Sequence, residues 1–185
     1  MNKETQFITP PGKVYRLLWT LIWALLCRWL PRSMGSNWKR FILNLFGAKI
    51  EKGAIVYSGA KIYCPYNLIM KRGACLDMGV NCYNVSTIIL EEDAVVSQGT
   101  FLCTASHDYT DPRHPLIGSP ITLCKRSWVA AQAFIGVGVT VGEGAVVGAR
   151  TAVFKNVEPW TVIGGNPAKY IKNRVLQFST GSSSI

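Results

Sequence analysis

The sequence predicts an all-β fold, a parallel β-helix of about five coils, because aliphatic residues recur every six positions from Ile50 onward. Small or β-branched residues stand four positions after each of the later aliphatic residues, and glycine or alanine often follows an aliphatic residue directly. A period of six fits neither an α-helix, with about 3.6 residues per turn, nor an ordinary alternating strand. Three hexads make one triangular coil, and stacked coils bury a continuous column of side chains.

The register divides residues 50–158 into five coils, with two-residue slips that indicate bulged corners. The coils lie near 50–67, 70–87, 90–107, 123–140 and 141–158. The predicted inward residues are Ile50, Val56, Ile62, Leu68, Met70, Leu76, Cys82, Ile88, Leu90, Val96, Leu102, Leu123, Val129, Ile135, Val141, Val147 and Val153. The small corner residues are Ser127, Ala133, Val139, Ala145, Thr151 and Val157. Glycines such as Gly142 are expected to relieve the turns between faces. A β-sandwich would instead need turn signals every 8–12 residues or so.

Residues 1–49 precede the repeat and form a separate N-terminal segment. Residues 1–13 are polar and rich in proline, so an irregular arm is expected. Residues 14–30 are apolar apart from two arginines and a threonine, which predicts a helix that Pro31 ends. Residues 37–46 predict a second, short amphipathic helix, with glycine as its stop signal.

The apolar run at 14–30 fits three arrangements. It is slightly shorter than the roughly 20 residues of a membrane span, and Arg16 and Arg28 bracket it. Its three tryptophans suit a helix that lies in the membrane interface. The third arrangement is a helix packed over the end of the β-helix or against another subunit.

The formal net charge of +10 is unevenly distributed. Residues 1–49 carry eight basic side chains against the single acidic Glu4. This segment therefore suits an anionic membrane surface or a phosphorylated ligand. Nucleic acid is not expected as a partner, because the basic residues stand among tryptophans and leucines and no helix-turn-helix, RNP or zinc-finger pattern is present.

The six cysteines form no C-x-x-C pair, and the chain has only two histidines, so no metal site is expected. No secretory cleavage pattern is found. The cysteines are interpreted as reduced, partly buried thiols of a cytoplasmic protein.

Residues 108–122, DYTDPRHPLIGSPIT, break the hexad rule and predict an external loop between the third and fourth coils. Both histidines, His107 and His114, lie at the root of this loop or within it. Loops inserted in a regular scaffold commonly carry function, so the active site is expected here.

Three features resemble the hexapeptide-repeat acyltransferases: the hexads, the segment LCTASHDYTDP at 102–112, and the segment VEPWTVIGGNPAKYIKNR at 157–174. The resemblance covers about residues 40–175 and is nearest to the colanic-acid-type exopolysaccharide acetyltransferases and to the galactoside and maltose acetyltransferases. It implies left-handed coils, acetyl-CoA as the co-substrate, and a short C-terminal helix within residues 159–185, followed by a disordered tail.

The resemblance assigns the role of general base to His107. A sugar hydroxyl is a poor nucleophile at neutral pH, and an imidazole can take its proton during attack on a thioester. Ser106 or Asp108 could orient the ring, and the sequence leaves this open. No G-x-S-x-G elbow is present, so direct transfer without an acyl-enzyme is expected.

Other site residues are carried over from the family pattern. A backbone N–H near Trp128-Val129-Ala130-Ala131 would stabilise the oxyanion. The predicted acetyl-CoA-binding residues are Ala131, Ala149, Lys155, Lys169 and Lys172. Phe154 stands where threonine is common in the family, and Lys169 and Lys172 stand where arginines can occur. The side chains expected to bind the CoA phosphates therefore differ in part from the family pattern. Asn84 and Asp108 are predicted to bind the acceptor, and a turn residue is the alternative for Asn84.

The resemblance implies an O-acetyltransferase that acts on a sugar hydroxyl in exopolysaccharide or other surface-glycan synthesis. Two alternatives stay open: transfer to an amino-sugar amine or an antibiotic, and a non-catalytic β-helix scaffold. A lone solenoid exposes flat apolar faces, so a homotrimer packed along its coils is expected. The expected location is the cytoplasm, at the inner face of the membrane if the N-terminal helices bind there.

Overall fold

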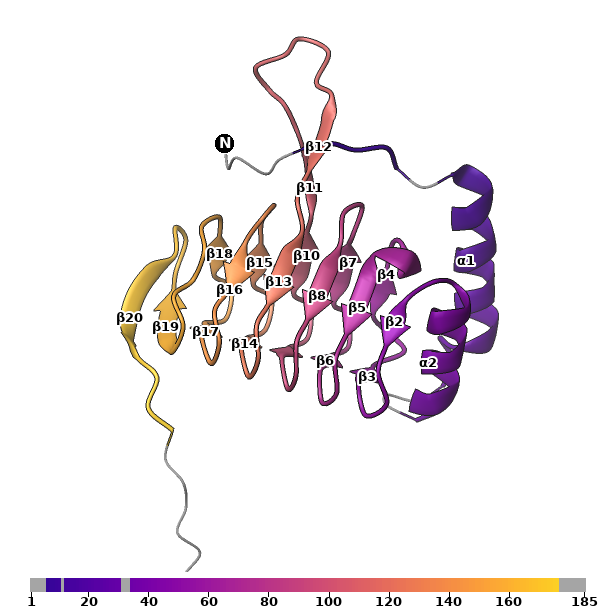
Figure 1. Cartoon of the computed structure of the whole chain (residues 1–185), viewed down its shortest axis with the longest axis horizontal. Coiled ribbons are helices and arrows are strands. Elements are labelled where there is room, and N and C mark those ends of the chain that lie inside the picture. The colour runs from indigo at the N-terminus through magenta and orange to yellow at the C-terminus, as the bar shows by residue number, and fades with distance from the viewer. Residues whose placement is uncertain (1–5, 11, 31–33, 177–185) are drawn as a thin grey trace, which may run out of the picture.

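The computed structural model describes residues 6–10, 12–30 and 34–176. It is a prism of stacked coils, with two helices at the N-terminal end and a hairpin that projects from one edge (Figure 1). The strands of neighbouring coils pair in parallel, as the hexads predict.

Each of the five complete coils contributes one strand to each of three sheets, which we call the first, second and third faces in chain order. The first face contains β2 (Lys49–Ile50), β5 (Leu68–Met70), β8 (Ile88–Leu90), β13 (Ile121–Leu123) and β16 (Thr140–Val141). The second contains β3 (Ile55–Val56), β6 (Cys75–Leu76), β9 (Val95–Val96), β14 (Trp128–Val129) and β17 (Val146–Val147). The third contains β4 (Lys61–Ile62), β7 (Asn81–Tyr83), β10 (Phe101–Cys103), β15 (Phe134–Ile135) and β18 (Ala152–Val153).

The core is the column of inward aliphatic side chains. Every predicted inward residue is buried, with at most 6 % of its surface exposed, and the six small corner residues are buried too. Leu76 shows how the column forms, because its strand registers Leu76 with Val56 of the coil before and Val96 of the coil after. The column continues along the whole solenoid, so this period predicts the core of the prism correctly; Trp19, Trp23 and Leu43 from the helical segment add to it.

The glycines that follow inward residues have a different role from the one expected. Gly142 does not have a positive φ; the left-handed position is Gly144, two residues later, with φ of 64°. A Cβ on Gly142 would lie 2.6 Å from the backbone nitrogen of Pro159. Gly142 therefore permits close stacking of the next coil, and Gly144 makes the turn.

The slips in the register correspond to a longer corner between the third and first faces. In the first coil this corner contains the 3-10 helix η1 (Pro65–Asn67). In the third coil the chain leaves the prism here as an antiparallel hairpin of β11 (Ala105–His107) and β12 (Leu116–Gly118). The expected third coil, 90–107, and loop, 108–122, are corrected: the excursion begins at Ala105, and Ile121 already belongs to the first face.

The N-terminal arm contains a strand rather than the irregular chain expected. β1 (Gln6–Phe7) pairs antiparallel with β12 and completes a three-stranded sheet in the order β1-β12-β11. The arm runs from the start of α1 to the base of the hairpin (Figure 1). A segment from the start of the chain therefore supports the hairpin of the third coil.

Both expected helices are present, as α1 (Lys13–Leu26) and α2 (Ser36–Leu45). Trp19 and Trp23 are buried against the first coil, and the Trp19 indole N–H donates to the carbonyl of Ile62 at 2.7 Å. One face of α1 therefore packs over the end of the prism. Pro31, expected to end this run, lies outside the described residues, and α1 ends before it. No helix in the described part of the chain is long and apolar enough to cross a membrane.

The expected C-terminal helix is absent from the described residues, and this prediction is wrong. β19 (Thr161–Gly164) adds a sixth strand to the second face, and β20 (Lys169–Asn173) folds back against it. Without β20, the backbone N–H and C=O groups along the outer edge of β19 would be unpaired, and the antiparallel pairing with β20 provides their hydrogen-bond partners. The tail expected at the end of the chain falls mainly on 177–185, outside the described residues.

Candidate active site

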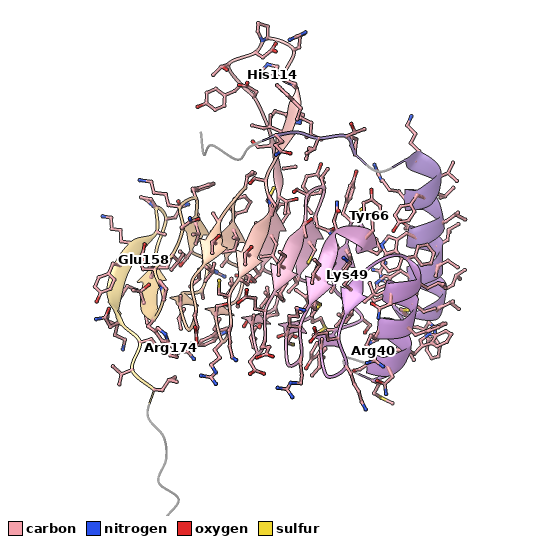
Figure 2. The ribbon with its side chains drawn as sticks, viewed as in Figure 1. Arg40, Lys49, Tyr66, His114, Glu158 and Arg174 are labelled. Carbon is pink, nitrogen blue, oxygen red and sulfur yellow. The ribbon has the colours of Figure 1, made fainter. Side chains whose placement is uncertain are left out.

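His107 is the last residue of β11 and lies on the projecting hairpin, exposed to solvent. It registers with Leu116 across the hairpin. Its Nδ1 lies 2.6 Å from the backbone carbonyl oxygen of His114, which sits near the hairpin tip (Figure 2). The carbonyl, and not Ser106 or Asp108, therefore orients the imidazole.

This contact determines which tautomer the neutral imidazole of His107 adopts. A carbonyl oxygen can only accept a hydrogen bond, so Nδ1 must carry the proton and donate it. Nε2 of His107 is then the nitrogen with the free lone pair. An exposed imidazole held in this form has the arrangement that a general base requires. His114 contributes through its backbone, and its φ is 46°, in the left-handed region.

The hairpin is anchored at its base by the N-terminal arm. Phe7 registers with Ile117, and the Ile8 N–H donates to the carbonyl of Leu116 at 3.3 Å. A Cβ on Gly118 would collide with the side chain of Ile8 and lie 2.9 Å from the carbonyl oxygen of Thr104. β1 therefore pairs with the outer edge of β12, the strand that pairs in turn with the strand of His107.

Asp108 lies at the start of the hairpin loop, and its carboxylate shapes that loop. It accepts hydrogen bonds from the Thr110 hydroxyl at 2.6 Å and the Thr110 N–H at 2.9 Å. These two bonds hold the pKa of Asp108 below its ordinary value. The carboxylate already accepts hydrogen bonds within the turn, which favours a structural role for Asp108 over the expected binding of the acceptor sugar.

Asn84 lies in the long corner between the third and first faces and is fully buried. Its Oδ1 accepts from the Cys64 N–H at 2.9 Å, and its Nδ2 donates to the Cys64 carbonyl at 2.5 Å. Both ends of the amide are thus used to join two coils. The expected acceptor role is not supported within one subunit, and the alternative of a corner residue fits instead.

Ala131 and Ala149 occupy equivalent corners between the second and third faces on successive coils. The Arg150 N–H donates to the Ala131 carbonyl at 2.9 Å and joins the two corners. Within the described chain, neither the Ala131 N–H nor the Ala149 N–H donates to a protein acceptor. The corners therefore present two unpaired backbone donors beside small side chains, an arrangement suited to an amide chain or an oxyanion.

Two of the three predicted phosphate-binding lysines line one pocket at the C-terminal end of the third face. This pocket has a volume of about 630 Å³ and includes Lys155 and Lys169. Its apolar lining includes Phe154, Ile163 and Tyr170. Lys172 is also on β20, where it registers with Val162, but does not line the pocket.

Sequence reasoning missed two contributors to the site, the His114 carbonyl and β1. A carbonyl leaves no trace in residue identity, and the β1 pairing joins segments more than a hundred residues apart. Among the described residues, no cluster of histidine, cysteine and acidic side chains could hold a metal ion.

No protein-family model matches the chain. It is 37 % identical over 158 residues to an Escherichia coli K12 protein that is provisionally named as the colanic acid biosynthesis acetyltransferase WcaF. The match covers 85 % of this chain and 86 % of WcaF. Both chains are thus aligned over most of their length.

Solved structures of acetyltransferases share the fold, and two of them illustrate the match. A hexapeptide-repeat acetyltransferase from Vibrio cholerae, complexed with acetyl-CoA, has a TM-score of 0.74 at 22 % identity and is matched over 87 % of both chains. A maltose O-acetyltransferase from Clostridium difficile 630 also has a TM-score of 0.74 at 22 % identity, over 89 % of this chain and 90 % of that one. The fold is therefore a left-handed parallel β-helix, as expected.

Proposed function

Because the chain belongs to the family of the colanic acid biosynthesis acetyltransferase WcaF, we propose that it transfers the acetyl group of acetyl-CoA to a sugar hydroxyl in surface-polysaccharide synthesis. The observation that carries the proposal is His107 itself. It stands on an anchored hairpin, with Nδ1 bound to a carbonyl and Nε2 free.

The proposed reaction is a direct transfer. Nε2 of His107 takes the proton of the sugar hydroxyl as the oxygen attacks the thioester carbon. The tetrahedral intermediate collapses, the carbon–sulfur bond breaks, and the imidazolium returns the proton to the sulfur of CoA. The products are the acetylated sugar and free CoA, and the base is regenerated.

Backbone donors at the corners would stabilise the charge that develops. The free N–H of Ala131 is the proposed oxyanion donor, and that of Ala149 is available to the amide groups of the pantetheine arm. A preorganised donor of this kind is worth a factor of about 10²–10³ in kcat. Alanine side chains at both corners leave room for the approaching substrate.

Lys155 and Lys169 are proposed to bind the phosphates of CoA, because they share one pocket with aromatic and aliphatic side chains. Lys172 extends the positive charge along the exposed face of β20. Lysine binds phosphate as a point charge, so this attraction should weaken with added salt.

The test is acetyl-CoA turnover by the full-length protein with a panel of sugars, amino sugars and chloramphenicol. Release of the CoA thiol is followed with Ellman's reagent, and the product is located by mass spectrometry and NMR. Acetylation of a sugar oxygen is expected. Transfer to nitrogen alone, or no acceptor-dependent release, would refute the proposal.

We also propose a homotrimer in which His107 of one subunit faces the later coils of another. The third face ends in exposed Phe154, and exposed Tyr109 extends from the hairpin, so apolar surface is available for contact. At an acetyl-CoA concentration too low for Lys155→Ala to work alone, mixed trimers of His107→Ala and Lys155→Ala subunits should regain activity if the site is shared. A monomer in light scattering, or no recovery after mixing, would contradict this arrangement.

The helical end is proposed to bind the inner surface of the membrane, which gives a cytoplasmic, peripheral location. Large apolar side chains of α1 and α2 are exposed there, namely Val14, Leu17, Leu18, Leu21, Leu25, Trp38, Phe41 and Leu45. Arg40 lies at the same end (Figure 2), and no acidic residue occurs between Glu4 and Glu51. Apolar side chains beside basic charge are typical of interfacial helices.

Vesicle co-sedimentation tests the membrane proposal. Full-length protein should bind phosphatidylglycerol vesicles, and the double change Leu17→Glu and Leu21→Glu should abolish binding while acetylation of a soluble sugar persists. Equal recovery with neutral and anionic vesicles, or a double variant that binds as well as the natural protein, would refute it.

A further inference from the structure

A second pocket lies at the opposite end of the third face, between α1 and the first coil. It has a volume of about 420 Å³. The buried indoles of Trp19 and Trp23 line it on the helix side. Lys61 and Tyr63 line it from the first coil, and Asn81 lines it from the second. The pocket therefore opens on the same face as the lysine pocket, on the other side of the His107 hairpin.

Its lining is positively charged. Arg16, Arg28 and Lys61 all contribute, and none of the lining residues is acidic. In the part of the chain that the structure describes, no carboxylate lies within ion-pair distance of these three cations. Three cations that line one pocket, with no carboxylate within ion-pair distance, suit an anion supplied from outside.

One of the cations is held in place. The Arg16 guanidinium donates to the Tyr63 hydroxyl at 2.7 Å, and its central carbon lies 4.7 Å from the centre of the Tyr63 ring. This contact orients a planar donor in the lining of the pocket. Arginine in a fixed orientation suits phosphate oxygens, which accept two parallel hydrogen bonds.

A row of aromatic rings runs along the third face from this pocket, past Phe101 on the coil that carries the hairpin, to Phe134 and to Phe154 in the lysine pocket. Tyr63 lies 5.0 Å from Tyr83, and Tyr83 lies 6.5 Å from Phe101, measured between ring centres. Tyr63 directly follows β4, and Tyr83 and Phe101 lie on the next strands β7 and β10, so the three rings span about 10 Å at the usual strand spacing. Phe101 begins the strand that directly precedes the hairpin. Half-buried aromatic rings offer flat apolar surface on which a sugar ring can lie.

We propose that the pocket binds the diphosphate through which the acceptor sugar is joined to its carrier. The diphosphate would lie between Arg16, Arg28 and Lys61, and the sugar would extend along Tyr83 and Phe101 toward His107. This inference rests on the proposed acetyl transfer and names its acceptor class as a sugar diphosphate. A lipid carrier and a nucleoside carrier share this chemistry.

The first test measures binding of inorganic pyrophosphate to the full-length protein by calorimetry, with CoA at saturation to fill the lysine pocket. Arg28→Gln and Lys61→Gln should each weaken binding about tenfold, in proportion to the loss of one charged hydrogen-bond donor. Lys52→Gln is the matched control, because Lys52 is exposed on the same coil but does not line the pocket. Arg16 is left unchanged because it also holds Tyr63.

The second test compares three acceptors that carry the same sugar: a methyl glycoside, a uridine diphosphate sugar and a farnesyl diphosphate sugar. Lys61→Gln should raise KM about tenfold for at least one diphosphate and leave KM for the methyl glycoside unchanged. The diphosphate that is affected identifies the carrier.

The outcomes separate this inference from the proposed function. Equal pyrophosphate affinity in Lys61→Gln, Arg28→Gln and Lys52→Gln would overturn the diphosphate site while acetyl transfer could still occur. A Lys61→Gln effect of equal size on all three acceptors would overturn it as well. Failure of the natural protein to acetylate any of the three, with every sugar of the panel used to test the proposed function, would instead refute that function.

Discussion

Replacement of His107 by alanine is the most direct test of the proposed chemistry. The change removes Nε2, the only ring nitrogen left free by the bond to His114, and leaves the β11–β12 backbone pairing in place. A positioned general base typically contributes about 10²–10⁴-fold, so kcat should fall by that factor. At about 1.4 kcal/mol per tenfold change, the activation barrier rises by about 3–5 kcal/mol.

The affinity for acetyl-CoA should change little, because the base acts in the transition state and the lysine pocket is separate from the hairpin. The assay is thiol release from acetyl-CoA at saturating sugar, with CoA affinity measured by calorimetry. The variant should also unfold at the same temperature as the natural protein, because the side chain of His107 is exposed.

His114→Asn is the matched control. His114 supplies only its backbone carbonyl, and asparagine tolerates the left-handed backbone conformation found there. Activity should therefore stay within about threefold of the natural protein, a change of less than 1 kcal/mol. Full activity in His107→Ala would refute the role of the base, and an equal loss in His114→Asn would show that the loop, rather than the His107 ring, determines the rate.

Four further perturbations probe the fold and the site. Lys155→Gln should raise KM for acetyl-CoA with kcat nearly unchanged, and the difference should shrink at high salt in initial-rate assays. Leu76→Ala should lower the free energy of unfolding by about 2–5 kcal/mol in urea titrations, whereas exposed Leu45→Ala should change it by less than about 0.5 kcal/mol. Gly118→Val should release β1 from the hairpin, seen as faster proteolysis within residues 6–12, and lower kcat about tenfold or more because His107 loses its anchor. Burial raises the pKa of Cys82 to about 12 and that of Cys27 to about 11, so at pH 8 both remain thiols and should resist Ellman's reagent until guanidinium unfolds the chain.

The core was predictable because one local rule produces it. An aliphatic residue at every sixth position must point into the prism, and Leu76, Val129 and Val147 all do so. The corner amides were not predictable in the same way. Asn84 stands in a corner where its side chain can turn inward to the backbone or outward to solvent, and residue identity does not decide between them.

The C-terminal prediction failed for a related reason. Lys169–Asn173 becomes a strand because β19 leaves hydrogen-bonding groups unpaired at the end of the second face, and that edge exists only once the coils have stacked. The sequence placed His107 beside the inserted segment but at the end of the third coil, whereas it lies on the hairpin outside the prism. The hairpin, the carbonyl partner of His107 and the strand β1 were not predictable, because all three depend on chain segments brought together by the fold.

The pairing of β1 with β12 has a consequence for the order of folding. The solenoid itself is made of contacts between neighbouring coils, which lie close in sequence and can form progressively from one end. The sheet that carries His107 depends on Gln6 meeting Gly118, a closure that spans most of the chain. Such long-range closures are slow relative to local pairing. During synthesis β1 therefore remains unpaired until β12, which follows the third coil, has been made. We expect acetyltransferase activity to appear later than the folded solenoid.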